Sequence, residues 1–330
     1  MENQLPFEKV ERDLFVKKEF ETDWSYGQDP NKRKIEELIN YGIINLNKSS
    51  GPTSHQVSDY VQRILNISKS GHSGTLDPGV TGVLPIALGK ATRIVQTLLN
   101  SGKEYVCLMY IHKLVDEKEI YKTIEKFKGK IKQLPPIRSA IKRRLRTREI
   151  YYFNILEING QEVLFKIGCE AGTYIRKIVH DFGQELKTGA HMQQLIRTKA
   201  GPFTDKDWHS LHDLRDAYEF YKEGDETEIR RIILPIEEAV KHLSKIWVVD
   251  SAVDSVCHGA YLSIPGISKL NNFNENETIA IMTLKDELVS LGTSVLNSGE
   301  IMNKEKGLAV KTTKVFMDRN VYPKFTSKKV

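Results

Sequence analysis

Apolar residues recur along the chain with two spacings, which predict short strands and amphipathic helices. Apolar runs at 42–46, 83–88 and 105–111 are typical of strands, and the last is apolar enough for a central strand covered on both faces. Elsewhere apolar residues stand three and four positions apart. This spacing predicts helices that begin near Pro30, Thr53, Lys90, Asp116 and Thr173.

Several of these helices have start signals. Asp29 and Pro30 suit the N-cap and first position of a helix, and Thr53 and Gln56 have the spacing of a capping box. Thr173 is expected to cap the helix that runs to Leu186. The predicted apolar faces are Ile35, Leu38 and Ile39; Val57, Tyr60, Val61, Ile64 and Leu65; and Ile175, Ile178, Val179 and Phe182.

A hairpin is predicted between residues 148 and 169, because Asn159-Gly160 separates two strand-like segments and suits a type I′ turn. Helices and paired strands alternate along the chain without a regular βαβ rhythm. The pattern therefore predicts an α+β fold with a mixed, largely antiparallel sheet and helices.

The pattern of apolar and polar residues changes twice along the chain, and these changes predict three structural parts. Residues 1–28 are polar and aromatic with little periodicity, so they are expected to form an extended arm. Residues 29–245 alternate helices and strands, whereas 246–330 consist of short strands with Gly and Pro turns, as in a small β-barrel.

Composition narrows the class of protein. The 330 residues, of which 40% are hydrophobic, are enough for two globular domains. No apolar run reaches the roughly 20 residues that span a bilayer, and the first residues lack a signal-peptide pattern, so a cytoplasmic protein is expected. Cys107, Cys169 and Cys257 are far apart and in no CxxC pair, which indicates buried thiols and no metal site. The formal charge of +6 only hints at a polyanionic partner.

The densest group of turn-forming residues, Gly71 to Gly79, surrounds one carboxylate, Asp77. Pro78 restricts the residue before it to extended conformations, and Gly79 permits the positive φ of a type II turn. A tight connection without function would have the same pattern. If the loop is functional, Asp77 is presented on a stiff turn.

Five ordered sequence blocks stand out over most of the chain. They are Gly71 to Arg93, Lys103-Glu104-Tyr105, Pro135 to Arg144, Gly168 to Arg176, and Cys257-His258-Gly259-Ala260. Together these blocks resemble the pseudouridine synthases that modify the tRNA T-loop and their RNA-guided relatives of the dyskerin type. The segment 250–266 resembles the start of a PUA domain, an RNA-binding barrel.

The resemblance implies a catalytic set of Asp77, Tyr105 and Arg176. Uridine isomerisation breaks an N-glycosidic bond, rotates the base and rejoins it through carbon. Asp77 would act on the sugar, either by forming an adduct or by removing a proton to give a glycal. Arg176 would pair with the aspartate, since a cation within about 4–6 Å favours an ionised carboxylate. Tyr105 would stack on the target base, with a possible role in proton removal.

The resemblance also implies RNA contacts. Lys48, which follows the first strand, matches a family lysine, and no P-loop string accompanies it. Leu195 would form an apolar wall for a flipped base, although Ile196 stands where the family usually has arginine. A dense basic run would cover the substrate as a mobile loop. The implied substrate-binding residues are Lys48, His72, Lys142, Arg143, Arg144, Arg146 and Leu195, and the implied guide-RNA-binding residues are His258, Gly259 and Ala260.

These implications define an expected function. The chain is expected to be a cofactor-free RNA pseudouridine synthase with a pseudouridine synthase fold, a C-terminal PUA barrel and an N-terminal arm that packs on this barrel. Its expected partners are substrate RNA, a box H/ACA guide RNA and small accessory proteins, with rRNA as the main target and tRNA as a second one. A standalone tRNA T-loop synthase and a non-catalytic scaffold of ribosome assembly remain as alternatives.

Overall fold

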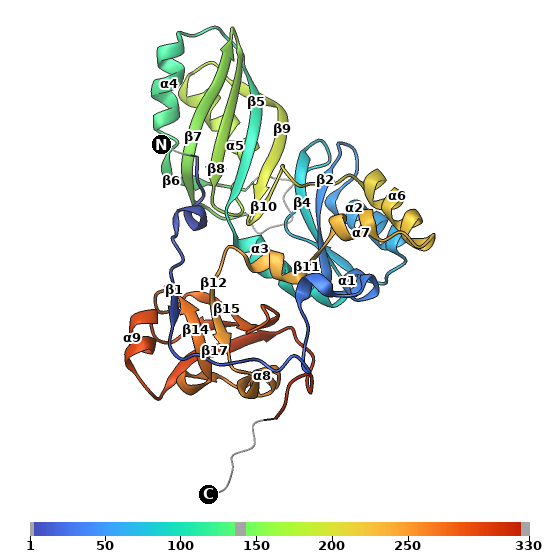
Figure 1. The fold of residues 1–330 in the computed structure, drawn as a ribbon. Coiled ribbons are helices and arrows are strands. Elements are labelled where there is room, and N and C mark those ends of the chain that lie inside the picture. Colours follow the sequence, from blue (N-terminus) through green and yellow to red (C-terminus); the bar gives the residue numbers. More distant parts are fainter. Residues whose placement is uncertain (1–2, 136–142, 325–330) are drawn as a thin grey trace, which may run out of the picture. The chain divides into compact units, whose positions relative to one another are not determined.

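The computed structural model describes residues 3–135 and 143–324, which form two compact units (Figure 1). The first unit comprises residues 1–9, 44–87 and 94–232, and the second comprises residues 10–43, 88–93 and 233–330. Within the described residues no helix has the length and apolar character needed to cross a bilayer. The helices are α1 (Ile35–Tyr41), α2 (Ser54–Leu65), α3 (Val95–Asn100), α4 (Glu117–Glu125), α5 (Ile175–Glu185), α6 (Leu211–Lys222), α7 (Thr227–Ile232), α8 (Asp250–Cys257) and α9 (Ser298–Asn303).

The larger sheet is mixed and mostly antiparallel. Its main path is β2 (Gly42–Lys48), β4 (Thr81–Leu88), β9 (Ala190–Ala200), β5 (Lys103–Ile111), β8 (Glu162–Cys169), β7 (Arg146–Asn159) and β6 (Gly129–Gln133). The short strands β3 (Ser70–His72) and β10 (Phe203–Thr204) pair with β4 and β9, and β11 (Ile233–Pro235) follows α7. β4 and β9 run parallel, whereas β5 is antiparallel to both β8 and β9. The predicted α+β fold and the central position of the 105–111 strand are confirmed.

Two helices of the first unit bear directly on the predicted site. In α5 the apolar residues Ile175, Ile178, Val179 and Phe182 are buried as predicted, and this helix packs against β9. In α2 the capping box of Thr53 and Gln56 is formed, and Val57, Val61 and Leu65 are buried. The apolar face of α5 therefore holds this helix on β9, and the capping box marks the residue at which α2 begins.

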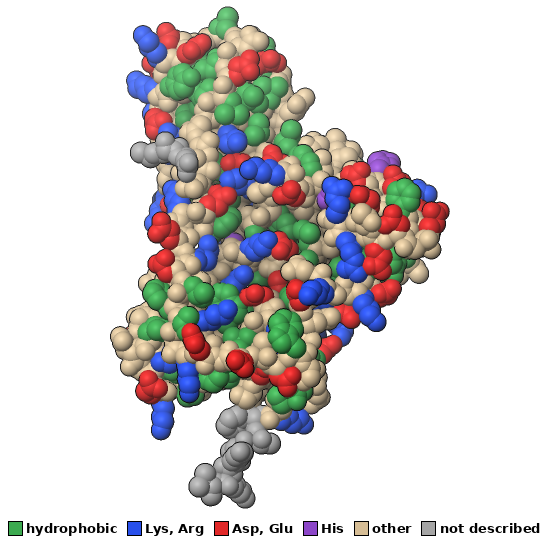
Figure 2. Space-filling model, viewed as in Figure 1, with side chains coloured by type: hydrophobic (Ala, Val, Ile, Leu, Met, Phe, Trp, Pro, Cys, Tyr) green, Lys and Arg blue, Asp and Glu red, His purple; other side chains and the backbone are tan. Residues whose placement is uncertain are grey.

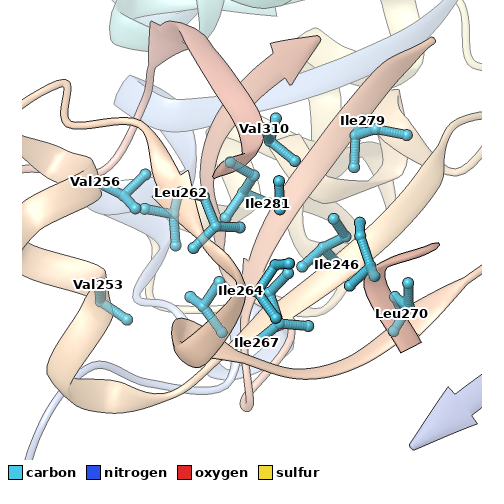
Figure 3. Close-up of a cluster of buried hydrophobic side chains, with 14 of the residues drawn as sticks. Ile246, Val253, Val256, Leu262, Ile264, Ile267, Leu270, Ile279, Ile281 and Val310 are labelled. Atoms are coloured by element: carbon cyan, nitrogen blue, oxygen red, sulfur yellow. The ribbon is translucent and has the colours of Figure 1, made fainter. Parts of the chain in front are cut away.

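The second unit is built on a separate sheet. Its order is β1 (Leu14–Val16), β14 (Ile267–Asn271), β12 (Ser244–Val248), β15 (Thr278–Thr283), β16 (Leu288–Ser294), β17 (Leu308–Val315) and β13 (Leu262–Ser263). Branched apolar side chains from these strands and from α8 meet in one core, in which Ile246, Ile264, Ile267 and Ile281 lie side by side (Figure 3). Burial of β-branched side chains on a pleated surface accounts for the strand preference of this region.

Residues 10–28 run along this second sheet. The strand β1 pairs antiparallel with β14, with Phe15 opposite Leu270. Further along, Lys17 donates through Nζ to the carbonyl oxygens of Met302 and Lys304, and Thr22 donates to Asp250. The segment therefore consists of an edge strand followed by side-chain anchors.

Several local predictions were wrong. Tyr60 is exposed, and Asp29-Pro30 opens only a short 3₁₀ turn before α1 begins at Ile35. The 148–169 hairpin is formed, but Asn159 pairs with Glu162, so Gly160 and Gln161 make the turn. Because φ is positive only at Gly160, the type I′ turn, which needs positive φ at both positions, is excluded.

Candidate active site

Asp77 lies in a tight turn between β3 and β4. The amide of Val80 donates to the Asp77 carbonyl oxygen at 2.9 Å, which closes a four-residue turn with Pro78 in its second position. Gly79 does not have a positive φ, so the predicted type II turn is wrong and the geometry is compatible with type I. The Asp77 side chain remains 54% exposed and faces outward from the turn.

Three neighbours hold the backbone of this turn. The hydroxyl of Ser54, in the first turn of α2, accepts from the amide of Leu76 at 2.8 Å. The amide of Gly51 donates to the Pro78 carbonyl oxygen at 3.0 Å. Lys48 Nζ donates to the same oxygen at 3.0 Å, to Val80 O at 2.8 Å and to Ser49 O at 2.9 Å. These contacts bind backbone atoms alone, so they fix the turn without using the carboxylate.

The position of Lys48 differs from its predicted role. Its side chain is fully buried, and its three protons are used by backbone carbonyl oxygens. The ammonium group therefore holds the backbone of the loop. Its three N–H donors are already used, so none is left to bind a phosphate. Ser54 also holds the backbone of the loop, and sequence reasoning missed it. The signal that could have found it is its position beside the capping box of α2.

Arg176 forms an ion pair with Asp77, with Nη2 donating to Oδ2. The arginine is the second residue of α5 and is 57% exposed. The carboxylate thus contacts a cation that comes from the first turn of this helix. Tyr174 is the N-cap and makes no side-chain cap, whereas Thr173 donates to Glu170 O at 2.7 Å, so the predicted Thr173 cap is wrong.

Tyr105 and Leu195 come from adjacent strands and lie on one face of the sheet. In the β5–β9 register Tyr105 is opposite Arg197 and Cys107 is opposite Leu195, so the four side chains share a face. Tyr105 and Leu195 are both buried. Burial raises the pKa of the Tyr105 hydroxyl while Arg197 opposes this rise, and the phenol keeps its proton at neutral pH.

His72 ends β3 and packs edge-on against His55, with ring centroids 4.7 Å apart. Its Nδ1 is buried and has no hydrogen-bond partner among the described residues. Burial, helped by His55 and Arg197, lowers the pKa of His72 from 6.5 to about 4. A neutral imidazole is therefore presented beside the aspartate loop.

We expect His72 to stay neutral until the pH falls to about 4, which a titration of the histidine ring signals by NMR can measure. The pKa of His72 is lower in the folded chain than its value of 6.5 in the unfolded chain. Between these two pKa values, His72 is therefore protonated in the unfolded chain and neutral in the folded chain. The contribution of His72 to stability is present above pH 6.5 and declines as the pH falls toward 4. A His72 resonance that titrates near 6.5 would contradict this environment.

The predicted basic loop is only partly within the described residues, since Lys142 lies outside them. Arg143 and Arg144 are exposed, and Arg146 begins β7. Arg148 donates to Glu170 at 3.0 Å, so this member of the run is already paired with an acid. On the face shown in Figure 2, lysine and arginine side chains are interspersed with acidic ones. The basic character is therefore concentrated in a short segment and does not form a broad field on that face.

The residues predicted to bind guide RNA lie in the second unit, where the chain turns at the end of α8. His258 is the C-cap of this helix, and Gly259 has a φ of +87° with open space around its α-carbon. Ala260 follows and is exposed. Tyr261 lies beside them and is 56% exposed. Sequence reasoning missed this residue, although an aromatic residue next to the motif is a signal that could have found it.

A cavity of about 540 Å³ lies elsewhere in the second unit, lined by Tyr41, Leu288, Phe316 and other residues. None of the predicted catalytic or RNA-binding residues lines it. Asp77 and Arg176 instead lie on open surface. If this exposed pair is catalytic, as the sequence predicts, it suits a macromolecular substrate that covers the site and inserts one nucleotide.

Family models match most of the chain. The TruB family pseudouridylate synthase (N terminal domain) matches residues 62–175, and the tRNA pseudouridylate synthase B C-terminal domain matches residues 176–241. The DKCLD (NUC011) domain matches residues 2–58, and the PUA domain matches residues 244–316.

Known proteins are similar over nearly the whole length. The probable tRNA pseudouridine synthase B of Pyrococcus horikoshii is 55% identical over 319 residues, which cover 96% of each chain. Its counterpart in Methanocaldococcus jannaschii is 50% identical over 319 residues, covering 96% of this chain and 95% of the relative. A chain in the crystal structure of a Cbf5-Nop10-Gar1 complex is 52% identical with a TM-score of 0.92, and one in an H/ACA RNP bound to a substrate RNA containing 2'-deoxyuridine is 50% identical with a TM-score of 0.91. In both cases the match covers 98% of this chain and 99% of the other.

Proposed function

The chain belongs to the TruB family of pseudouridylate synthases and is an RNA uridine isomerase, and we propose that it works as the catalytic subunit of a box H/ACA guide ribonucleoprotein. The observation that supports this most directly is the Asp77–Arg176 pair on a fold that matches chains of H/ACA particles over 98% of its length. Its partners would be substrate RNA, a guide RNA and accessory proteins like Nop10 and Gar1. Its targets would be uridines in rRNA and tRNA, and its compartment the cytoplasm.

In the proposed mechanism Asp77 acts on the ribose of a flipped uridine. Its carboxylate either attacks C1′ as the bond to N1 breaks, or removes a proton from C2′ to give a glycal. The uracil then rotates and its C5 bonds to C1′, as the bond from Asp77 to C1′ breaks in the first route or as the proton returns to C2′ in the second. In both routes the C5 proton is lost and N1 gains one. Arg176 pairs with the carboxylate and holds it in place, while Tyr105 and Leu195 would line the space for the base.

We propose a division of labour along the chain. Residues 29–245 would carry the isomerisation, residues 246–330 would form a PUA domain that binds the guide, and the arm at 1–28 would brace this domain. The pairing of β1 with β14 supports the last role. The exposed turn of His258, Gly259 and Ala260, with Tyr261 beside it, supports guide binding, because single-stranded RNA is recognised by exposed base edges and aromatic stacking.

The test is a pseudouridine-formation assay with purified protein, accessory proteins and a target RNA. We expect modification with a guide ending in ACA and loss of both binding preference and modification when the ACA is scrambled. Equal modification with both guides would reject the guided function. It would favour a standalone tRNA T-loop synthase, an alternative with which the relatives' name, probable tRNA pseudouridine synthase B, is compatible. Binding without any turnover would favour the scaffold role.

A second prediction concerns the basic segment. Replacement of Lys142, Arg143, Arg144 and Arg146 by alanine should weaken RNA binding across sequences. The slope of log K against log salt should flatten by up to about 3, since each lost phosphate contact removes roughly 0.7–0.9. The control replaces Arg230 and Arg231, which are paired with Glu226 and Glu228. An unchanged slope in the quadruple variant would exclude this segment from the RNA interface.

A further inference from the structure

Glu104, on β5, has a buried carboxylate that the proposed mechanism does not use. Its side chain is 3% exposed. Tyr152 donates its hydroxyl proton to Oε2 at 2.5 Å, and Thr198 donates to Oε1 at 2.7 Å. Lys166 Nζ lies 3.8 Å from Oε1. A buried carboxylate is unfavourable unless it is paired and hydrogen-bonded, so we treat these four residues as one unit, the Glu104 clamp.

The clamp lies in one row across the neighbouring strands β7, β8, β5 and β9 of the larger sheet (Figure 1). Gly168 on β8 is opposite both Glu104 on β5 and Tyr152 on β7. A β-carbon at Gly168 would lie 2.3 Å from two ring carbons of Tyr152. The ring therefore lies over the glycine and reaches Glu104 two strands away. A side chain at position 168 would block this contact.

Thr198 is the extra residue of a β-bulge in β9. In the pairing with β5, Lys199 is opposite Glu104. The strands continue with Arg197 opposite Tyr105, so Thr198 and Lys199 together face one residue of β5. The Thr198 hydroxyl donates to Glu104, as described above. The carboxylate is therefore bonded to the bulged residue itself.

The bulge decides which side chains of β9 lie on the face of Tyr105. Side chains alternate between the two faces along a strand, so a shift of one residue moves each of them to the other face. With the bulge, Arg197 and Leu195 lie on the face of Tyr105. In a regular ladder continued from Glu104, both would lie on the opposite face. The predicted wall for the base thus depends on this bulge.

Arg197 connects the bulge to the aspartate loop. It is 1% exposed, and Nε donates to the carbonyl oxygen of Val83 at 2.7 Å. Nη2 donates to the carbonyl oxygen of Gly74 at 3.2 Å. These two acceptors lie on either side of Asp77 in the sequence. Arg197 therefore holds both ends of the loop on β9, and the bulge places it there.

We propose that Glu104 is a positioning residue that fixes the bulge at Thr198 and thereby the shape of the site. The inference rests on the proposed function, because this site is the one for the flipped uridine. The carboxylate acts only through β9: it holds the bulge, and the bulge directs Leu195 and Arg197. Loss of this contact should slow the isomerisation and leave RNA affinity nearly unchanged, since the proposed phosphate contacts come from another segment.

The test compares Thr198→Val with Thr198→Ser, measured as kcat and KM for pseudouridine formation. Valine has nearly the shape of threonine without the hydroxyl, whereas serine keeps the hydroxyl and loses a methyl group. We expect Thr198→Val to lower kcat by about 10- to 100-fold and Thr198→Ser by less than about 3-fold, with KM changed less than about 3-fold in both. A packing role alone would give the opposite order. That order, equal effects on kcat, or a loss in KM alone would overturn the proposal.

A double-mutant cycle with Glu104→Gln tests the partner of Thr198. The combined loss of kcat in Glu104→Gln with Thr198→Val should be at least about 5-fold smaller than the product of the single losses, because both changes break one contact. Losses that multiply fully would overturn the proposal. The control is Glu237→Gln, which alters a buried carboxylate bonded to Arg33 in the second unit. It should lower Tm and keep kcat within about 2-fold. An equal loss of kcat in this control would show that destabilisation alone slows the enzyme.

Hydrogen–deuterium exchange of residues 197–199 tests the clamp without catalysis. Exchange should be faster in Thr198→Val than in Thr198→Ser, because the bulge opens more readily when its hydroxyl is lost. Equal rates would overturn the clamp. The measurement needs only these two variants, so it decides even if Glu104→Gln fails to fold. If wild-type protein forms no pseudouridine, the proposed function fails, whereas the exchange rates still decide whether Glu104 holds the bulge.

Discussion

Purified Asp77→Asn protein should form pseudouridine roughly 10⁴-fold more slowly than wild type or not at all, the scale of loss when an enzyme loses its nucleophile. The amide has nearly the same shape as the carboxylate but can neither attack C1′ nor take a proton. Stability and RNA affinity should change little, because the turn is held through backbone atoms by Ser54, Gly51 and Lys48. Tritium release from RNA labelled at uridine C5 would measure the rate.

The matched control for Asp77→Asn is Asp59→Asn, which removes one exposed carboxylate from α2. This variant should retain wild-type turnover. Substantial pseudouridine formation by Asp77→Asn, with mass spectrometry excluding deamidation back to aspartate, would contradict the assignment of the catalytic carboxylate.

Arg176→Ala should separate stability from catalysis. Because both partners of the ion pair are more than half exposed, the pair should contribute less than about 1 kcal/mol to the free energy of unfolding. Turnover should nevertheless fall by about 10²- to 10³-fold. Once RNA covers the site and excludes water, the same pair acts in a medium of lower dielectric constant and holds the carboxylate where charge develops.

The measurements for Arg176→Ala are kcat by single turnover at saturating RNA and the free energy of unfolding by denaturant titration. Arg231→Ala, which breaks a similarly exposed pair with Glu228, serves as the control and should affect neither. An Arg176→Ala enzyme with near-normal turnover would show that the ion pair does not matter in the bound state.

The sequence predicted elements well where a local signal agreed with burial. The capping box at Thr53 and the apolar face of α5 are examples, since both depend on residues within one or two turns. Prediction from the sequence failed where several local structures fit the same residues equally well and tertiary packing decided which of them formed. The hairpin register moved the turn by one residue to Gly160, because pairing along all of β7 and β8 outweighs the preference of a single dipeptide.

The site was less accessible to sequence reasoning. The contact between Asp77 and Arg176 joins residues 99 positions apart, and only the family resemblance suggested it. Lys48 was placed against RNA because it matches a lysine of the resembling family, but the direction of its side chain is decided by the loop that folds over it. Arg197 was passed over since its burial and its pairing with Tyr105 depend on the register of β9, which no local pattern specifies.

The pairing of β1 with β14 also has a consequence for biosynthesis. Partners such as Lys18 and Ser268 are separated by 250 residues, so the ribosome needs about 12–50 s to make the second after the first. During this interval the segment around Leu14, Phe15 and Val16 has no β14 to pair with, so its backbone hydrogen-bonding groups are unpaired beside apolar side chains that are exposed in the folded protein as well. The second unit can complete its sheet only near the end of translation. We therefore expect slowed or interrupted synthesis to yield aggregation-prone chains, and chaperones that bind extended apolar segments to favour this N-terminal stretch.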